Sequence, residues 1–261
     1  MHVLALPLYN QKKSLPKTIM NLLSLFEGIS EKDKEIAIKD LISDSSPSAP
    51  FFFLVILSTI MATLGIIAEN ASVVIGSMLI APILSPILSL SLGTIMSDRK
   101  LMNWSLVTIL KSTVYALGFA IIATLLFATN YDVTLANTEI FSRTKPEIIY
   151  LMIAIVAGAA TAYARVKSEL NEALPGTAIA VALVPPLAVS GIGIATLNAS
   201  IAVGAFQMYL LNLIGIIIAA VVTFSFMDLY SKRTMAEKAQ EKEDKKLART
   251  KAKAEKESKK K

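Results

Sequence analysis

The sequence predicts an all-α integral membrane protein with six transmembrane helices, arranged as two inverted three-helix repeats. Three observations carry this prediction. The 261-residue chain is 54% hydrophobic and has a mean hydropathy of +0.59, which is too apolar for an ordinary soluble domain. Its apolar residues gather in blocks of about 20 residues, the length that a helix needs to cross a bilayer. Two of these blocks, in matching halves of the chain, carry prolines near their middle.

Six apolar blocks define a transmembrane domain over residues 50–228. The predicted helices cover about residues 51–68, 72–96, 104–129, 148–164, 175–197 and 200–227. The first and second helices, and also the fifth and sixth, are joined by very short connections. We therefore expect each of these pairs to form a tight antiparallel hairpin.

A mixed polar segment, residues 1–49, precedes the first transmembrane helix. Apolar residues at helical spacing predict a short amphipathic helix over residues 16–26. Ser30 followed by Asp33 is a variant of the capping box and predicts a second helix that ends near residue 42. We expect both helices to lie at the cytoplasmic face of the membrane, either as a regulatory element or as plain juxtamembrane structure.

The second and fifth predicted helices are expected to be broken. Pro82 and Pro86 lie in the second helix, and Pro185 and Pro186 lie in the fifth. A proline inside a helix removes one backbone hydrogen bond and clashes with the preceding turn. In hydrocarbon the freed carbonyl, such as that of Met78, needs a partner from protein or from water in a cavity. Broken helices in a membrane therefore indicate tight packing or a polar path.

Helices one to three and four to six resemble two copies of one unit, covering about residues 50–129 and 146–228. Each copy starts after a proline, continues through a short link with Glu and Asn, and then has a proline-containing second helix. Aligning the segment 79–84 on 183–188 gives an offset of 104 residues. Because three spans are an odd number, the second copy must be inverted in the membrane. Inverted repeats with interrupted helices are typical of transporters with a site near the bilayer midplane.

Basic residues in the loops predict the orientation. With both termini in the cytoplasm, 24 Lys and Arg residues lie inside and 2, Arg143 and Lys145, lie outside. The sequence thus predicts a multi-pass protein of the cell membrane. The tail, residues 229–261, contains 13 basic and 6 acidic residues and accounts for the positive charge of the whole chain, +6. We expect the tail to be attracted to anionic lipid headgroups or to be simply solvated, and we expect no nucleic-acid partner.

Composition limits the chemistry that the chain can perform. Cysteine is absent, which excludes disulfides and thiolate chemistry, and His2 is the single histidine. We expect no cofactor, whereas the sequence leaves open whether a metal ion binds. Charged residues in or near the membrane are few: Glu69 lies at the outer end of the first hairpin, and Arg165 and Glu172 lie at the inner end of the link between helices four and five.

The stretch from Glu69 to Pro86 resembles a known family of prokaryotic membrane proteins. Its Glu69-Asn70 pair, Gly76, the run Met78 to Pro82, and Pro86 are similar to the characteristic stretch of the domain of unknown function 389. The run Val184 to Ala188 resembles the second half of that family. The resemblance covers about residues 50–228 and implies a multi-spanning membrane protein, without a substrate.

The leading hypothesis is a homo-oligomeric transporter or channel for a small solute or ion, with a path between the broken second and fifth helices. One alternative is a membrane enzyme that acts on lipid or lipid-linked headgroups, and another is a scaffold that docks a partner through the tail. The residues expected to line the path or bind the substrate are Glu69, Asn70, Ser77, Met78, Pro82, Ser85, Pro86, Arg165, Glu172, Val181, Ala182, Pro185 and Pro186.

Overall fold

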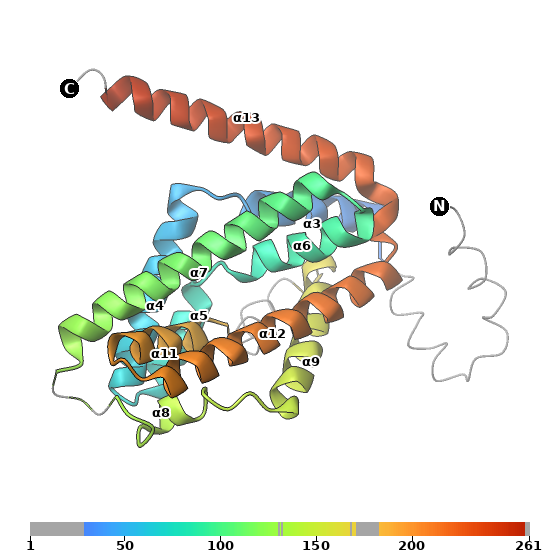
Figure 1. Cartoon of the computed structure of the whole chain (residues 1–261). Helices are drawn as coiled ribbons and strands as arrows, with labels where there is room; N and C mark the ends of the chain where they lie inside the picture. Colours follow the sequence, from blue (N-terminus) through green and yellow to red (C-terminus); the bar gives the residue numbers. More distant parts are fainter. Residues whose placement is uncertain (1–28, 130, 132, 168, 171–182, 259–261) are drawn as a thin grey trace, which may run out of the picture.

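The computed structural model describes residues 29–129, 131, 133–167, 169–170 and 183–258, and within these ranges all regular structure is helical (Figure 1). The helix expected over residues 16–26 lies outside the described residues. The elements are α3 (Glu31–Asp44), α4 (Ala49–Ile67), α5 (Ala71–Ile80), α6 (Leu84–Met96), α7 (Arg99–Phe127), α8 (Thr138–Phe141), α9 (Ile148–Val166), α11 (Val184–Ala195), α12 (Ala199–Phe226), η3 (Leu229–Lys232) and α13 (Arg233–Ser258).

Four helices of the described chain are long and apolar enough to cross a membrane: α4, α7, α9 and α12. The pair α5 and α6 passes the same test as one span with a 50° bend, which raises the number to five. The fifth expected span, residues 175–197, corresponds to α11, which has 12 described residues and is about 18 Å long at 1.5 Å per residue. A helix of this length crosses little more than half of a hydrocarbon core of about 30 Å.

Three helix hairpins share one turn. In each, the backbone N–H of the residue that caps the second helix donates to the carbonyl of a glycine five residues earlier, at 2.8–2.9 Å. The residue before the cap has a positive φ of 49–55°, and the cap is Asn or Asp. The glycines lack a Cβ where the next helix passes closely. The three turns are Gly65–Asn70 between α4 and α5, Gly93–Asp98 between α6 and α7, and Gly193–Asn198 between α11 and α12.

The bundle has two ends, which we name after the short helices that cover them. At the α8 end lie the α4–α5 turn, α8 and the α11–α12 turn; there, the carbonyl of Thr144 packs against Gly204 of α12. At the α3 end, α3 packs on α6 and on α9, and the same apolar cluster includes the last turns of α12. The long helices α7 and α12 run antiparallel between the two ends (Figure 1).

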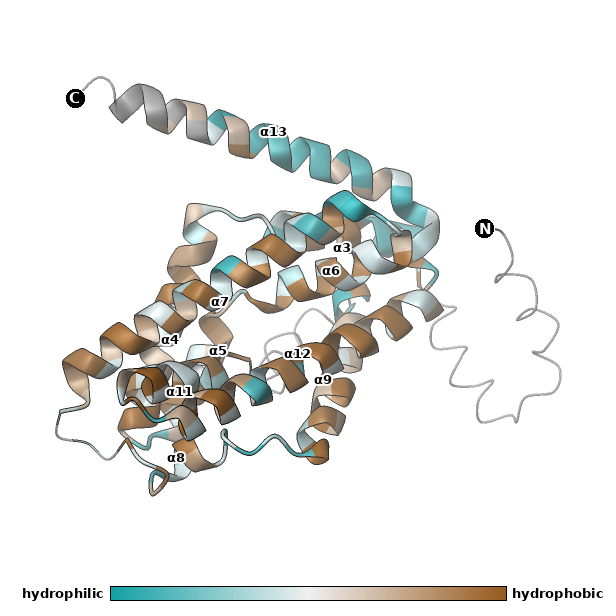
Figure 2. Ribbon diagram, viewed as in Figure 1, coloured by the Kyte–Doolittle hydropathy of each residue, from teal (hydrophilic) through white to brown (hydrophobic). Residues whose placement is uncertain are grey.

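Two apolar clusters form the core. The first surrounds α11, all of whose residues from Val184 to Gly193 are buried, and includes parts of α4, α5, α7 and α12. The second lies at the α3 end and joins α3 to α6, α9, α12 and the start of α7. The charged helix α13 lies outside the apolar bundle, across the α3 end (Figure 2).

The start of α3 agrees with the predicted capping box. Ser30 Oγ accepts a hydrogen bond from the backbone N–H of Asp33 at 3.1 Å and lies 2.7 Å from the Asp33 carboxylate. The helix continues to Asp44, two residues beyond the predicted end, because Leu41 and Ile42 still pack into the second cluster.

Candidate functional site

The interruption between α5 and α6 is partly buried in the bundle: Ile83 is buried and Ala81 and Pro82 are half-buried, whereas Leu79 and Ile80 just before them are exposed. Helix α5 ends at Ile80, α6 begins at Leu84, and Pro82 lies in the three-residue segment between them. The axes of the two helices differ by 50°. Pro86 lies in the first turn of α6, where its missing N–H costs no helical hydrogen bond.

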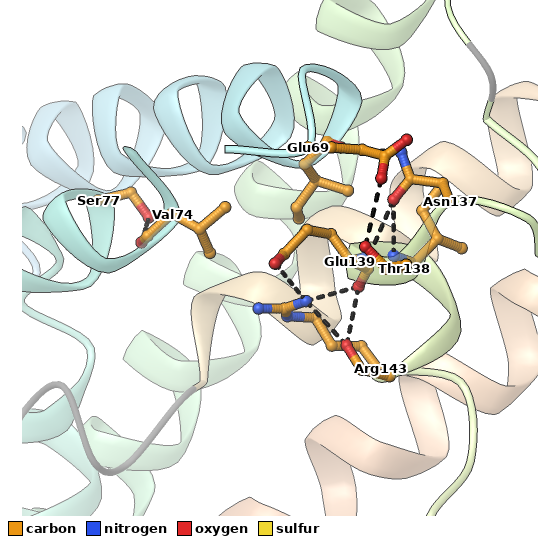
Figure 3. A network of polar contacts seen from close by, with 10 residues as sticks. Glu69, Val74, Ser77, Asn137, Thr138, Glu139 and Arg143 are labelled. Atoms are coloured by element: carbon orange, nitrogen blue, oxygen red, sulfur yellow. Dashed lines mark hydrogen bonds and ion pairs between the residues drawn. The ribbon is translucent and has the colours of Figure 1, made fainter. Parts of the chain in front are cut away.

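Serine hydroxyl groups donate hydrogen bonds to backbone carbonyls near the end of α5. Ser77 is fully buried, and its Oγ donates to the carbonyl of Val74 at 2.6 Å (Figure 3). Its own carbonyl, one of the four that the end of α5 leaves without a helical partner, accepts from Ser58 Oγ of α4 at 2.8 Å. Met78 is 9% exposed and packs in the first cluster, and Ser85 is half-buried in the first turn of α6. Protein hydroxyls therefore satisfy part of the polar backbone at the interruption.

Helix α11 begins in the same cluster. Leu183 and Val184, at its start, share the first cluster with Ala81 and Ile83 of the interruption. Pro185 and Pro186 both fall in the first turn of α11, a position that proline tolerates. The expected break in a longer fifth helix involves residues before Leu183, and Val181 and Ala182 lie outside the described residues. The observed feature is thus a short helix that starts inside the bundle and is buried from Val184 to Gly193.

Among the described residues, no side chain caps the start of α6 or of α11. The first N–H groups of a helix have no partner within the helix and carry a partial positive charge. Because proline has no N–H, the start of α6 keeps three of these groups, those of Ile83, Leu84 and Ser85, and the start of α11 keeps two, those of Leu183 and Val184. Two such starts lie in the interior, and the two helices leave it toward opposite ends of the bundle: α6 toward the α3 end and α11 toward the α8 end.

A polar network closes the α8 end (Figure 3). Glu69 is exposed and accepts from Thr138 Oγ1 at 3.2 Å. Asn137 is fully buried; its amide donates to the carbonyl of Ile66 at 3.0 Å and its Oδ1 caps α8. Arg143 forms an ion pair with Glu139 at 2.7 Å. From the sequence, this connection is predicted only as a loop with two basic residues; the capping residue Asn137 followed by Thr and Glu is the local signal for α8.

The structure separates the predicted charged residues. Asn70 caps α5 beside Glu69 and accepts from the N–H of Val73. Arg165 lies at the other end of the bundle, where its guanidinium pairs with Asp44 at the end of α3. Glu172 lies outside the described residues. Across the ranges that the structure describes, no group of three or more His, Cys, Asp or Glu side chains could hold a metal ion.

These features define a multi-pass, all-helical membrane protein with an interrupted helix in its core. The chain belongs to the family described as "Domain of unknown function (DUF389)", whose model matches residues 78–218. It is 35% identical over 172 residues to a protein of Methanocaldococcus jannaschii that is named only as uncharacterized. The match covers 66% of this chain and 52% of that relative, so the chain spans about half the length of the relative. No solved structure matches the chain.

Proposed function

We propose that the protein is a transporter or channel for a small solute or ion, with a path that passes the α5–α6 interruption and the start of α11. The observation that supports this most directly is the pair of uncapped helix starts inside a membrane bundle. Irregular backbone at membrane depth is tolerated where it is buried in protein or lines a polar cavity, and transporters build their sites from such half-helices.

The order of helices supports two repeats. Corresponding elements are separated by 99 or 100 residues: α4, α6 and α7 begin at 49, 84 and 99, and α9, α11 and α12 begin at 148, 184 and 199. The offset is 100 rather than the 104 residues expected from the proline alignment. It pairs Pro86 with Pro186 and Gly93 with Gly193, so the turns that follow α6 and α11 also correspond.

Contacts between the repeats are reciprocal. Ser91 of α6 faces α12 and donates to the carbonyl of Ile217 at 3.5 Å. Gly191 of α11 faces α7, and a Cβ built on it would lie 3.2 Å from the carbonyl of Leu117. At an offset of 100 residues, Gly191 corresponds to Ser91 and Leu117 corresponds to Ile217. The two contacts are therefore equivalent when the repeats are exchanged, as a pseudo-two-fold axis between the repeats requires.

Contacts within each repeat correspond in the same way. The rings of Phe52 on α4 and Tyr115 on α7 lie 5.1 Å apart. The equivalent positions, Leu151 on α9 and Gly215 on α12, also touch: a Cβ on Gly215 would lie 3.1 Å from Leu151. A large pair in the first repeat thus corresponds to a smaller and closer pair in the second. The antiparallel course of α7 and α12 supports an inverted relation between the repeats (Figure 1).

We place the α3 end in the cytoplasm. Arg99, Lys100, Arg165 and Lys167 lie at this end, and the basic tail follows there, whereas Arg143 and Lys145 lie near the α8 end. In this orientation α13 lies at the cytoplasmic surface, where its basic side chains would be attracted to anionic lipid headgroups. The enzyme alternative needs acidic and polar groups that converge at one depth, but Glu69 and Arg165 lie at opposite ends.

The test is solute entry into proteoliposomes of the full chain, measured by reswelling after hyperosmotic mixing. Entry of sodium is measured with sodium thiocyanate. Entry of chloride and phosphate is measured with their potassium salts in the presence of valinomycin, and entry of neutral solutes is measured with glycerol and glycine. We expect at least one solute to enter faster than in protein-free liposomes. We also expect Pro82→Ala, which permits a continuous helix, to lower that rate, and Pro185→Ala, in a first turn, to lower it less. Entry no faster than in protein-free liposomes, or unchanged by Pro82→Ala, would contradict the proposal.

A further inference from the structure

Helix α3 seals the α3 end of the bundle. Ile38, Leu41 and Ile42 are fully buried, and they pack in one cluster with Leu88 and Leu92 of α6. The same cluster takes in the last turns of α9 and α12. The half of α6 that leads from the interruption to this end is therefore covered by α3.

The contact between α3 and α6 has a polar centre. Ser89 Oγ of α6 donates to the carbonyl of Leu41 at 2.9 Å and lies 2.5 Å from Ser45 Oγ, and the Ser45 hydroxyl contacts the same carbonyl. Ser45 and Ser89 are both buried. These groups fix the position of α3 along α6.

This polar contact can be exchanged at low cost. A serine in a helix can donate to the carbonyl four residues earlier on its own chain, as Ser91 does to Ile87 at 3.1 Å. If α3 left, Ser89 could turn to its own helix in the same way and remain hydrogen-bonded. Separation of α3 from α6 therefore need not leave a buried hydroxyl without a partner.

Ion pairs hold α3 at both ends. Near its start, Lys232 of η3 lies 2.7 Å from Glu31 and 3.9 Å from Glu35. At its end, Asp44 pairs with Arg165 of α9. The carboxylates of Glu31 and Asp44 are largely exposed, and ion pairs of this kind stabilise weakly, so they can hold α3 without locking it.

We propose that α3 is the cytoplasmic gate of the transport path and that it leaves the cytoplasmic half of α6 to open the path. This inference rests on the proposed transport function. The present structure is then the state that is closed to the cytoplasm, with the hydroxyl contact at Ser45 and Ser89 in place.

The first experiment locks the gate. Because the chain has no cysteine, the double variant Ser45→Cys/Ser89→Cys introduces one thiol pair at a position where the native oxygens are 2.5 Å apart. Disulfide formation is measured by the loss of thiols that react with a maleimide after unfolding. We expect oxidation to lower entry of the transported solute by more than tenfold and a reductant to restore it. The two single variants should transport equally under both conditions.

The second experiment measures opening without transport. A single cysteine at Ser89 is labelled with a membrane-impermeant maleimide added to the cytoplasmic side. Lys232→Glu removes the ion pair with Glu31, and we expect labelling to become about two- to fivefold faster, the factor that one exposed ion pair allows. The matched control is a cysteine at Ser105, also buried, in the part of α7 that lies toward the α3 end, whose labelling should not change.

The outcomes separate this inference from the proposed function. If no solute enters in any variant while Lys232→Glu still accelerates labelling at position 89, α3 opens but the transport function is wrong. If solutes enter at the same rate in the oxidised and reduced double variant, α3 is not the gate. A double variant that forms no disulfide, together with a labelling rate at position 89 that Lys232→Glu leaves unchanged, would also overturn the inference.

Discussion

The reciprocal contact between α11 and α7 makes Gly191→Ala the most informative stability variant. A Cβ at Gly191 would collide with Cβ of Ala120 and lie 3.2 Å from the carbonyl of Leu117. Neither group is the end of a flexible side chain, so one of the two helices must shift. Overpacking of this kind costs about 1–3 kcal/mol. The better helix propensity of alanine returns about 0.5–1 kcal/mol, which leaves a net destabilisation of up to about 2.5 kcal/mol.

Gly118→Ala is the matched control, because a Cβ at Gly118 of α7 meets no atom within 4 Å. It should be neutral or stabilising by up to about 1 kcal/mol. Thermal unfolding in detergent, followed by the fluorescence of the single tryptophan, Trp104, compares the two variants. For a chain of this size, 1 kcal/mol corresponds to about 2–4 °C. A Gly191→Ala protein as stable as Gly118→Ala would refute the close approach of α11 to α7.

Three further predictions concern the turns and the ends of the bundle. Leu197 has φ of 55° and is 92% exposed, so Leu197→Gly should raise the melting temperature, by relief of about 1 kcal/mol of backbone strain. Asn137→Ala removes the α8 cap and the buried bond to Ile66, and we expect it to lower stability by about 1–3 kcal/mol in the same assay. The pairing with Lys232 lowers the pKa of Glu31 from 4.5 to about 2, so the folded protein binds this proton less tightly than a free side chain does. The contribution of this ion pair to the docking of α3 should therefore be fully present above about pH 4.5 and be lost as the pH falls toward 2. This loss should appear as faster amide exchange in α3 after correction for intrinsic rates, and Glu31→Gln should lack this dependence.

The sequence predicts the long helices well because each is a single apolar block. The bounds of α4, α9 and α12 lie within two residues of the predicted ones. The prolines are harder to interpret, since the same residue interrupts a helix in its middle and is favoured in its first turn. Pro82 lies in an interruption, whereas Pro86, Pro185 and Pro186 lie in first turns.

Other features depend on contacts that one local segment does not encode. Aligning the proline runs predicts a repeat offset of 104 residues, whereas aligning the turns from Gly to Asn or Asp that follow α6 and α11 favours the proposed offset of 100 residues. Helix α3 is largely polar, and its sequence alone does not show that it covers α6. This position depends on the packing of Ile38 and Leu41 in one cluster with residues of α6. The polar network around Asn137 joins residues about 70 positions apart.

Water access to the α5–α6 interruption is the most direct test of the central claim. A single cysteine replaces Ala81, the residue before Pro82, in the otherwise cysteine-free chain in liposomes, and Ala62→Cys, fully buried in α4, is the control. The account predicts that a small charged methanethiosulfonate reagent modifies position 81 at least tenfold faster than position 62. Equal, slow modification of both positions would show a dry interior and would contradict a path at the interruption.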